Sequence, residues 1–388
     1  MNGAARTRHR APRLALFTKH LAGGGAQRVL INLAHGFLAA GYQVDVVVAR
    51  ADGTLRGAVP AGARLVDLGA RRAITALPAL ARYFRAAAPD AALATINYAN
   101  VTALLARRLC GARFPLTVRE ANILSRDTYT PRSLKTRVLR VLMRLTYRWA
   151  HAVVVNSADT RRGLIEWGIA GADSIHHIPN PLDLESVAHL ARQRPDHPWL
   201  QADPSIQAPV VLGVGRLVPQ KDYPTLIEAF ALLHRQTPAA RLIILGEGPL
   251  RAQLEELIRG LGLGAAVSMP GFVANPYAWM KRASLFVLSS RWEGSPNVVA
   301  EALACGAAVV ATDAPGGARE LLAPGAGGCA PGLLTPVGDA AALAAAMRQV
   351  LAQPHRPDLC RAAVAAYSLD RIVPRYAAAM GLASPEAG

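Results

Sequence analysis

The sequence predicts an α/β fold with two doubly wound parallel sheets, one in each half of the chain. Short apolar runs alternate with longer amphipathic stretches in both halves. Glycines follow the first apolar run of each half, at residues 23–25 and 213–215, where a strand would pass into a loop. The chain has 388 residues, 52% of them hydrophobic, which is enough for two cores of ordinary size.

The first half repeats a strand and a helix several times. Each expected strand is a short run rich in valine, leucine and alanine, and the helix that follows it is longer and amphipathic. Strands separated by helices of this length lie parallel in one sheet. We expect strands at residues 14–17, 43–49, 64–67, 91–95, 114–118, 152–155 and 176–178, and helices at 26–39, 77–85, 101–109, 135–150 and 160–167.

A proline-rich stretch at residues 192–209 interrupts this alternation. We interpret it as a linker between an N-terminal domain of residues 1–191 and a C-terminal domain of residues 210–365, each with the strand and helix pattern of a nucleotide-binding fold. Residues 366–388 are expected to form a C-terminal helix that packs back on the N-terminal domain. In the second half we expect strands at 210–215, 241–245, 267–269, 285–290 and 307–311, and helices at 223–234, 250–261, 276–282, 296–304, 339–351 and 359–379.

The chain is strongly basic, with 43 Lys and Arg against 26 Asp and Glu and a formal charge of +17. Arginine supplies nearly all of this charge, because only four lysines are present. One explanation is the composition bias of a GC-rich genome, and the other is attraction to an anionic surface. No aromatic and basic interleaving, zinc-ligand spacing or helix-turn-helix pattern accompanies the charge, so we expect no nucleic-acid partner.

The cysteines and the apolar runs indicate the cellular compartment in which the protein works. Cys110, Cys305, Cys329 and Cys360 are widely spaced and form no CxxC pair, which favours a reducing cytoplasm over a disulfide framework. No signal peptide is visible, and no apolar run reaches the length of a membrane-spanning helix. We therefore expect a cytoplasmic protein, held at the inner face of the membrane only peripherally.

The most informative motif is Arg291-Trp-Glu293-Gly-Ser-Pro-Asn-Val-Val-Ala-Glu301. It follows an expected strand and leads into an expected helix, so Glu293 falls at the carboxyl end of a strand, where open α/β sheets bind ligands. Ser295 is a plausible N-cap and Pro296 suits the first helical position. The amides of such a helix start can hold a phosphate, and the two carboxylates can bind sugar hydroxyls.

A second motif places two cations after another strand, in Gly213-Val-Gly-Arg216-Leu-Val-Pro-Gln-Lys221-Asp222. Arg216 and Lys221 can neutralise a diphosphate, and Asp222 can cap the helix that follows. Two loop cations alone are more often merely solvated, but the glutamate motif downstream favours a binding role. A third motif, GGGAQR at residues 23–28, also joins a strand to a helix but lacks the GxGxxG pattern of dinucleotide sites.

The order of these motifs resembles the retaining glycosyltransferases of family 4, also called group 1. The resembling segments are GGGAQR, IPNP, VGRLVPQKD, GEGPL, SSRWEGSPNVVAEALACGAAVVATD and GLLTPVGD, within roughly residues 13–350. The resemblance implies the GT-B fold, in which two Rossmann-like domains face each other across a cleft. It also implies transfer of a sugar from a nucleotide-sugar with retained configuration, assisted by the departing phosphate.

The resemblance further assigns roles to residues. Arg216 and Lys221 would hold the diphosphate, Glu301 the ribose, and Glu293 the donor sugar near its transferred carbon. Since these cations and a helix start would stabilise the leaving diphosphate, no metal or other cofactor is expected. Phe272 and Val273 would lie at the nucleotide base, and Gly24 and Gly25 of the glycine loop would close over the diphosphate. The full donor-binding set comprises Gly24, Gly25, Arg216, Lys221, Phe272, Val273, Glu293, Gly294, Ser295, Pro296, Asn297, Val298 and Glu301.

The residues that would contact the acceptor have a weaker sequence signal than those that would bind the donor. The segment Thr117-Val-Arg119-Glu120-Ala-Asn122, with Asn97 and Asn100 upstream, is similar to the subgroup that extends lipid-linked or cell-surface glycans. We predict Asn97, Asn100, Arg119, Glu120 and Asn122 as acceptor-side residues and Glu120 also as a catalytic one. The alternative is that Glu120 only pairs with Arg119 on a surface loop.

The predicted helix at residues 133–149 carries two stripes. The apolar stripe contains Leu134, Val138, Val141, Leu145 and Trp149, and the basic stripe contains Arg137, Arg140, Arg144 and Arg148. One interpretation is a helix that lies on an anionic membrane with its arginines at the head groups. The other is a domain helix whose apolar stripe faces the core.

The combined prediction is a glycosyltransferase that moves a hexose or N-acetylhexosamine from a nucleotide-sugar, with UDP favoured over GDP. The expected acceptor is a saccharide linked to polyprenyl diphosphate. Two alternatives stay open. A sugar-nucleotide epimerase of similar fold would form product without an acceptor, and a non-catalytic nucleotide-sugar or lipid-binding scaffold would bind nucleotide without turnover.

Overall fold

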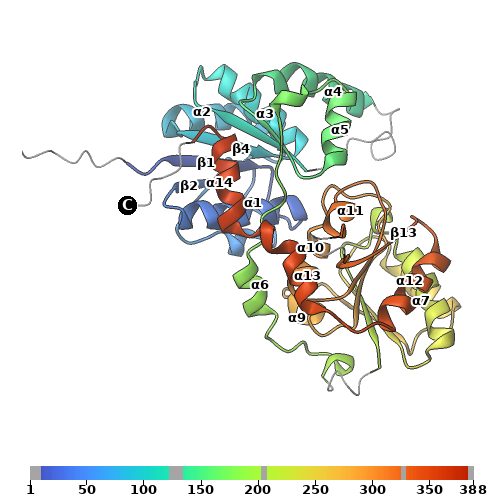
Figure 1. Ribbon diagram of the computed structural model, residues 1–388. Helices are drawn as coiled ribbons and strands as arrows, with labels where there is room; N and C mark the ends of the chain where they lie inside the picture. The colour runs from blue at the N-terminus through green and yellow to red at the C-terminus, as the bar shows by residue number, and fades with distance from the viewer. Residues whose placement is uncertain (1–9, 122–133, 202–207, 325–328, 383–388) are drawn as a thin grey trace, which may run out of the picture. The chain divides into compact units, whose positions relative to one another are not determined.

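The computed structural model describes residues 10–121, 134–201, 208–324 and 329–382. The chain divides into two compact units. The first contains residues 1–155, 161–181 and 369–388, and the second contains residues 156–160 and 182–368. Each unit is built on one parallel sheet with helices packed against it (Figure 1).

The sheet of the first unit has the strand order β3-β2-β1-β4-β5-β6-β7. The chain thus builds outward from β1 in one direction and then returns to its other side at β4, which is the doubly wound pattern. All neighbouring strands pair in parallel. The strands are β1 (Arg13–Thr18), β2 (Gln43–Val48), β3 (Arg64–Asp67), β4 (Ala91–Thr95), β5 (Leu116–Glu120), β6 (Val153–Val155) and β7 (Ile175–His177).

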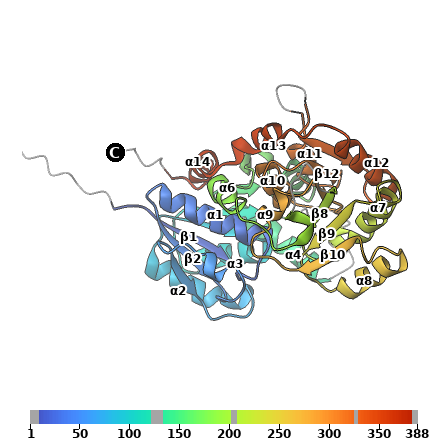
Figure 2. The same cartoon turned by 90° about the horizontal axis from the view of Figure 1, so that it is seen from below.

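The C-terminal helix α14 (Leu369–Ala379) belongs to the first unit. It lies beside α1 (Gly25–Ala39), as Figures 1 and 2 show. A Cβ on Gly36 of α1 would lie 2.4 Å from Cγ2 of Val373, so the missing side chain is what lets the two helices approach. The other α-helices of this unit are α2 (Leu77–Ala87), α3 (Asn97–Leu109), α4 (Leu134–Thr146) and α5 (Ala158–Glu166), of which α5 begins in the short 156–160 segment.

The sheet of the second unit has the strand order β10-β9-β8-β11-β12-β13 and is also parallel. Its strands are buried on both faces: Leu212 of β8 packs in one apolar cluster and its neighbour Val211 packs in the other. The strands are β8 (Val210–Val214), β9 (Arg241–Leu245), β10 (Val267–Gly271), β11 (Leu285–Leu288), β12 (Val309–Thr312) and β13 (Gly332–Thr335). The helices are α6 (Leu184–Leu190), α7 (Tyr223–Gln236), α8 (Arg251–Gly260), α9 (Tyr277–Met280), α10 (Asn297–Ala304), α11 (Ala318–Leu321), α12 (Ala340–Leu351) and α13 (Pro357–Val364).

The crossing between the units differs from the expected linker at residues 192–209. Apart from the short 156–160 segment, the second unit begins at Leu182, and α6 and the segment after it already pack into that unit's core through Val187 and Leu200. The imidazole of His197 lies 5.5 Å from the Trp279 ring in a tilted arrangement and forms a hydrogen bond with Ser268, at 3.1 Å between Nε2 and Oγ. The prolines therefore shape an ordered surface segment over residues 192–201, and residues 202–207 lie outside the described part.

The expected helix at residues 359–379 is two helices. α13 ends at Val364, and α14 starts at Leu369 in the other unit. Between them Ser368 is extended and pairs with Leu182 in an isolated parallel bridge. The chain passes between the units after residue 181 and again after residue 368, and both of these crossings thus lie at this bridge. The extended Ser368 is the reason that the helix cannot continue.

Helix α4 does not turn its predicted apolar stripe toward the core. Its buried apolar side chains among the described ones are Leu139 and Met143, at 3% and 1% exposure. The alternative that the predicted apolar stripe faces the core is therefore wrong for its first four members. Their exposed fractions are 75% for Leu134, 49% for Val138, 54% for Val141 and 48% for Leu145.

Candidate active site

The candidate site lies at the carboxyl ends of β8 and β11. These strands are neighbours at the point where the strand order of the second sheet reverses. Loops that leave neighbouring strands at such a point diverge to opposite faces of the sheet and leave a crevice for a ligand. The loop after β8 carries Arg216 and Lys221, and the loop after β11 carries Glu293. The topology thus brings the two strongest sequence motifs to one edge.

Lys221 and Glu293 are in direct contact there. The ammonium of Lys221 lies 2.5 Å from Oε1 of Glu293, and the side chains are only 13% and 9% exposed. The hydroxyl of Ser290 donates to the same oxygen at 2.6 Å. The predicted diphosphate cation and the predicted sugar carboxylate are therefore brought together as an ion pair. Burial strengthens such a charge pair because little water screens it.

The loop that carries Glu293 is fixed by its neighbours in β12 and the following turn. The amide of Glu293 donates to the carbonyl of Pro315 at 2.9 Å, and the Thr312 hydroxyl donates to the carbonyl of Ser290 at 2.5 Å. Gly316 has φ of +129°, and a Cβ there would lie 2.3 Å from the Glu293 carbonyl oxygen. Only glycine allows this close approach, so Gly316 helps to define the position of Glu293.

Replacing Gly316 by alanine is expected to lower the free energy of unfolding by about 1–3 kcal/mol, because the new methyl group overlaps backbone that has no room to move. The same change should reduce binding or turnover through a displaced Glu293. Gly264→Ala is the matched control, since no atom lies within 4 Å of its Cβ position. Equal thermal unfolding midpoints for the two variants would contradict this account of Gly316.

The caps expected from the sequence are wrong in detail. Pro296, not Ser295, occupies the N-cap of α10, and the helix begins at Asn297. Asp222 does not cap α7 with its side chain. Its carboxylate instead accepts a hydrogen bond from the Thr225 hydroxyl at 2.9 Å and pairs with Arg291 at 3.1 Å. Asp222 therefore connects the two loops of the site.

Glu301 lies in the second turn of α10 and is 6% exposed. The Tyr277 hydroxyl lies 3.5 Å from its Oε1, which limits the directions in which the carboxylate can turn. Burial, followed by the charge of Glu301, raises the pKa of the nearby Cys305 thiol to about 12. Cys305 is thus a protonated packing residue, and Glu301 is the group available at this position.

The remaining predicted donor residues of this unit lie at the same edge of the sheet. Arg216 is exposed directly after β8, and Phe272, which follows β10, is 65% exposed. Val273 packs partly against the core. Around the start of α10, Pro296 is buried, while Gly294, Ser295, Asn297 and Val298 are partly exposed.

The glycine loop belongs to the first unit. Gly24 is the N-cap of α1 and Gly25 is its first residue, so the loop places a helix start after β1. Gly23 has φ of +82°, and a Cβ there would lie 2.6 Å from the hydroxyl of Thr54. The backbone of this turn therefore requires glycine at residue 23, while Gly24 is extended.

The predicted acceptor-side pair, Arg119 and Glu120, does not lie on a surface loop. Both residues end β5 and are buried, at 1% and 0% exposure. Consecutive strand residues point to opposite faces of a sheet, so the two side chains do not pair with each other. Tyr147 donates to Oε2 of Glu120 at 3.0 Å.

Arg119 is bound by neutral groups in the described part of the chain. Its guanidinium donates to Asn180 Oδ1 at 2.5 Å, to Thr95 Oγ1 at 3.1 Å and to the Tyr376 hydroxyl at 3.1 Å. The side chain thus connects β4, the segment between β7 and Leu182, and helix α14. In this structure it is an interior anchor rather than a surface group.

Asn97 and Asn100 are buried as well, at 1% and 0% exposure. The amide of Asn100 donates to the Arg119 carbonyl and to the Tyr147 hydroxyl, both at 3.0 Å. Asn122 lies outside the described residues. The four described acceptor-side residues therefore form one interior region at the carboxyl ends of β4 and β5, and their contact with an acceptor stays a prediction.

Two notable residues were missed from the sequence. Ile96 follows β4 as the N-cap of α3, beside the point where the strand order of the first sheet reverses, and has φ of +79°. A β-branched residue rarely adopts this conformation, so no sequence signal announces it. Ser290 looks like the polar end of a strand but contacts the central carboxylate.

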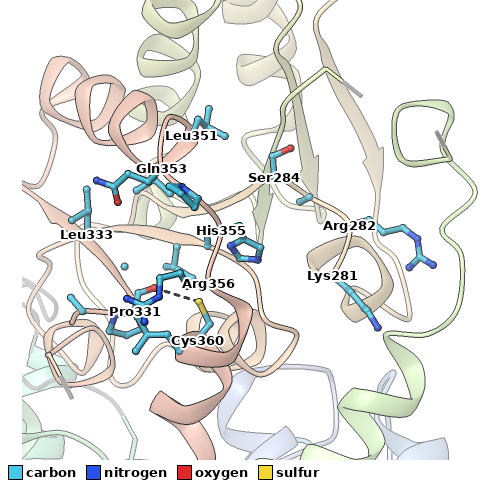
Figure 3. Close-up of a pocket in the computed structure, with 18 of the residues that line it drawn as sticks. Lys281, Arg282, Ser284, Pro331, Leu333, Leu351, Gln353, His355, Arg356 and Cys360 are labelled. Carbon is cyan, nitrogen blue, oxygen red and sulfur yellow. Dashed lines mark hydrogen bonds between the residues drawn. The ribbon is translucent and has the colours of Figure 1, made fainter. Parts of the chain in front are cut away.

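A cavity of about 840 Å³ lies elsewhere in the second unit. Its lining includes Ser284, Ala308 and Pro331, the residues that precede β11, β12 and β13. It is therefore at the amino ends of these strands, opposite to the edge that carries Glu293. Figure 3 shows Lys281, Arg282 and Ser284 on one side of it and Pro331, Leu333 and Arg356 on the other.

Comparison with known proteins identifies both halves. The profile of Glycosyl transferases group 1 matches residues 202–366, and that of the Glycosyl transferase 4-like domain matches residues 24–181. The solved structure of Anabaena Alr3699/HepE in complex with UDP and glucose superposes with a TM-score of 0.75 and 24% identity, over 95% of this chain and 99% of that one. This likeness establishes the GT-B fold.

Curated relatives include two bacterial enzymes. The N-acetylgalactosamine-N,N'-diacetylbacillosaminyl-diphospho-undecaprenol 4-alpha-N-acetylgalactosaminyltransferase of Campylobacter jejuni is 33% identical over 232 residues, 60% of each chain. Lipopolysaccharide core biosynthesis glycosyltransferase LpsD of Rhizobium meliloti is 32% identical over 176 residues, 44% of this chain and 48% of that protein. The matches thus span about half to 60% of these relatives' length. The motifs, the fold and both profiles agree that this chain belongs to the group 1 glycosyltransferases.

Proposed function

We propose that this protein transfers a hexose or N-acetylhexosamine from a UDP-sugar to a saccharide acceptor, with retained configuration, in glycan biosynthesis. The observation that carries the proposal is the contact of Lys221 with Glu293 at the reversal point of the second sheet. A cation and a carboxylate at one ligand-binding edge match the two charges that develop when a sugar–phosphate bond breaks.

The leaving diphosphate gains negative charge during that step. Lys221 and the exposed Arg216 supply two cations on the loop after β8, and the start of α10 adds partly exposed backbone groups. Such preorganised positive groups stabilise a developing anion without metal. The sugar ring gains positive charge, and Glu293 is the carboxylate placed to stabilise it. Glu301, one helix turn into α10, is proposed for the ribose hydroxyls.

The comparisons support the choice of substrates. The structural neighbour from Anabaena holds UDP and glucose, which favours a UDP-sugar donor. The Campylobacter relative is named for a diphospho-undecaprenol-linked acceptor, and the Rhizobium relative for lipopolysaccharide core biosynthesis. We therefore propose a saccharide on polyprenyl diphosphate as the acceptor of this chain.

Such an acceptor lies in a membrane, and helix α4 provides a surface that fits one. No helix in the described part of the chain has the length and apolarity needed to cross a bilayer. Instead α4 exposes Leu134, Val138, Val141 and Leu145. Arginines lie along the same helix, which contains no acidic residue. Apolar side chains flanked by cations suit the head-group region of an anionic leaflet at the inner membrane face.

The double variant Val138→Glu/Val141→Glu should bind vesicles that contain phosphatidylglycerol roughly thirtyfold more weakly, since each added charge near such a surface costs about 1 kcal/mol. Its thermal midpoint should stay near that of the wild type, because both side chains are about half exposed. Leu261→Glu/Val337→Glu, at comparably exposed positions of the second unit, is the control. An equal loss of vesicle affinity in both double variants would show that the net charge of the protein, and not α4, determines binding.

The enzymatic test follows nucleotide release with and without acceptor. A transferase releases UDP at a rate that rises with acceptor concentration. A sugar-nucleotide epimerase would change the donor without any acceptor, and a binding scaffold would hold UDP without turnover. Either of the last two results would overturn the proposal.

A further inference from the structure

Ser290 is buried beside the proposed catalytic carboxylate. It follows β11, is fully enclosed, and donates its hydroxyl to Oε1 of Glu293 at 2.6 Å. Its own carbonyl accepts a hydrogen bond from Thr312 at 2.5 Å, which fixes the backbone from which the hydroxyl projects. The short side chain therefore has few other orientations available.

Two donors share one carboxylate oxygen. Lys221 and Ser290 both bind Oε1 of Glu293, at 2.5 and 2.6 Å. Among the hydrogen bonds of the described residues, none involves Oε2, and the Glu293 side chain keeps 9% of its surface exposed. The carboxylate is thus held by one oxygen, while the other makes no hydrogen bond to the described part of the chain.

The two donors differ in how readily a diphosphate can displace them. Lys221 has a long, flexible side chain whose ammonium would gain from a second, more highly charged anion nearby. Ser290 has a neutral hydroxyl, a single short side-chain torsion and no access to solvent. A donor diphosphate therefore competes for Lys221 but leaves the bond from Ser290 intact.

We infer that Ser290 is a positioning residue, which keeps Glu293 oriented with Oε2 toward the donor sugar when Lys221 turns to the diphosphate. This inference rests on the proposed transferase function. It predicts that Ser290 acts on turnover through Glu293 and contributes little to the binding of UDP, which Lys221 and Arg216 govern.

The test is a double-mutant cycle on the full-length protein, with kcat and KM measured for the UDP-sugar. Ser290→Ala should lower kcat about tenfold to a hundredfold, the effect of one hydrogen bond to a charged group, with little change in KM or UDP affinity. Ser290→Ala/Glu293→Gln should be no slower than Glu293→Gln alone, because the two residues act as a unit.

Ser289→Ala is the comparator. Ser289 is also buried, but its hydroxyl donates to the backbone carbonyl of Lys221 at 2.8 Å and does not contact Glu293. The change in kcat caused by Ser289→Ala should add, in free energy, to that caused by Glu293→Gln. The positioning role of Ser290 would be overturned, and the transferase function left intact, by either of two results. One is a Ser290→Ala variant with kcat within twofold of wild type. The other is a Ser290→Ala/Glu293→Gln variant whose loss of kcat is the product of the two single losses. A wild-type protein that transfers no sugar would overturn the proposed function, and this inference with it.

Discussion

Glu293→Gln is expected to lower kcat for sugar transfer by about a hundredfold to a thousandfold, the usual effect of removing one preorganised electrostatic group from a transition state. Glutamine keeps the size of the side chain but cannot balance positive charge on the sugar ring. It also leaves the Lys221 ammonium without its buried counter-ion, at 2.5 Å in the native site. UDP affinity should change little, since a freed Lys221 can still bind the diphosphate.

Two comparisons make this result specific. Glu301→Gln should mainly raise KM, because we propose that its carboxylate binds the ribose and not the reacting sugar. Glu256→Gln is the neutral control, since that side chain is 70% exposed and pairs with Arg259 on the surface. Steady-state kinetics with one donor and one acceptor distinguish these three variants by their kcat and KM. A Glu293→Gln enzyme with kcat within twofold of wild type would refute the role of Glu293.

Arg119→Ala is expected to destabilise the protein by about 3–5 kcal/mol, because it leaves several buried polar partners unsatisfied and opens a cavity. The guanidinium is 1% exposed and contacts Asn180, Thr95 and Tyr376. These partners come from the segment after β7, from β4 and from α14, so the substitution loosens three segments that are distant in sequence.

The effect is measured by thermal or denaturant unfolding of the full chain, with Arg148→Ala as the control. Arg148 is exposed and lies over the Trp149 ring at 5.8 Å, a contact worth about 0.5–1 kcal/mol at such a site. Arg119→Ala with a midpoint equal to that of Arg148→Ala would show that the interior network contributes little. A stable but inactive Arg119→Ala would instead favour the acceptor-side role predicted from the sequence.

The sequence predicted the fold because parallel strands buried on both faces appear as uninterrupted apolar runs. It predicted the edge that holds Lys221 and Glu293 because the carboxyl ends of neighbouring strands meet there. It did not predict that these two residues bind each other, since that depends on how two loops far apart in sequence fold together. Ser290 was missed for the same reason.

Other differences come from element ends and helix faces. The strand predicted at 114–118 is β5, Leu116–Glu120, so Arg119 and Glu120 were expected in a loop although they are strand residues in the interior. On α4 the more regular apolar stripe is the exposed one, and Leu139 and Met143 face the core. Periodicity identifies an amphipathic helix, but tertiary packing decides which side is covered.

We propose that a sugar passes from a UDP-sugar to a polyprenyl-diphosphate-linked saccharide at the Lys221–Glu293 centre. Wild-type protein incubated with both substrates in the presence of EDTA would give a lipid product that mass spectrometry and NMR can identify. One sugar should be added per UDP released, joined with the anomeric configuration of the donor. An inverted linkage, an unchanged acceptor or complete dependence on a divalent metal would contradict it.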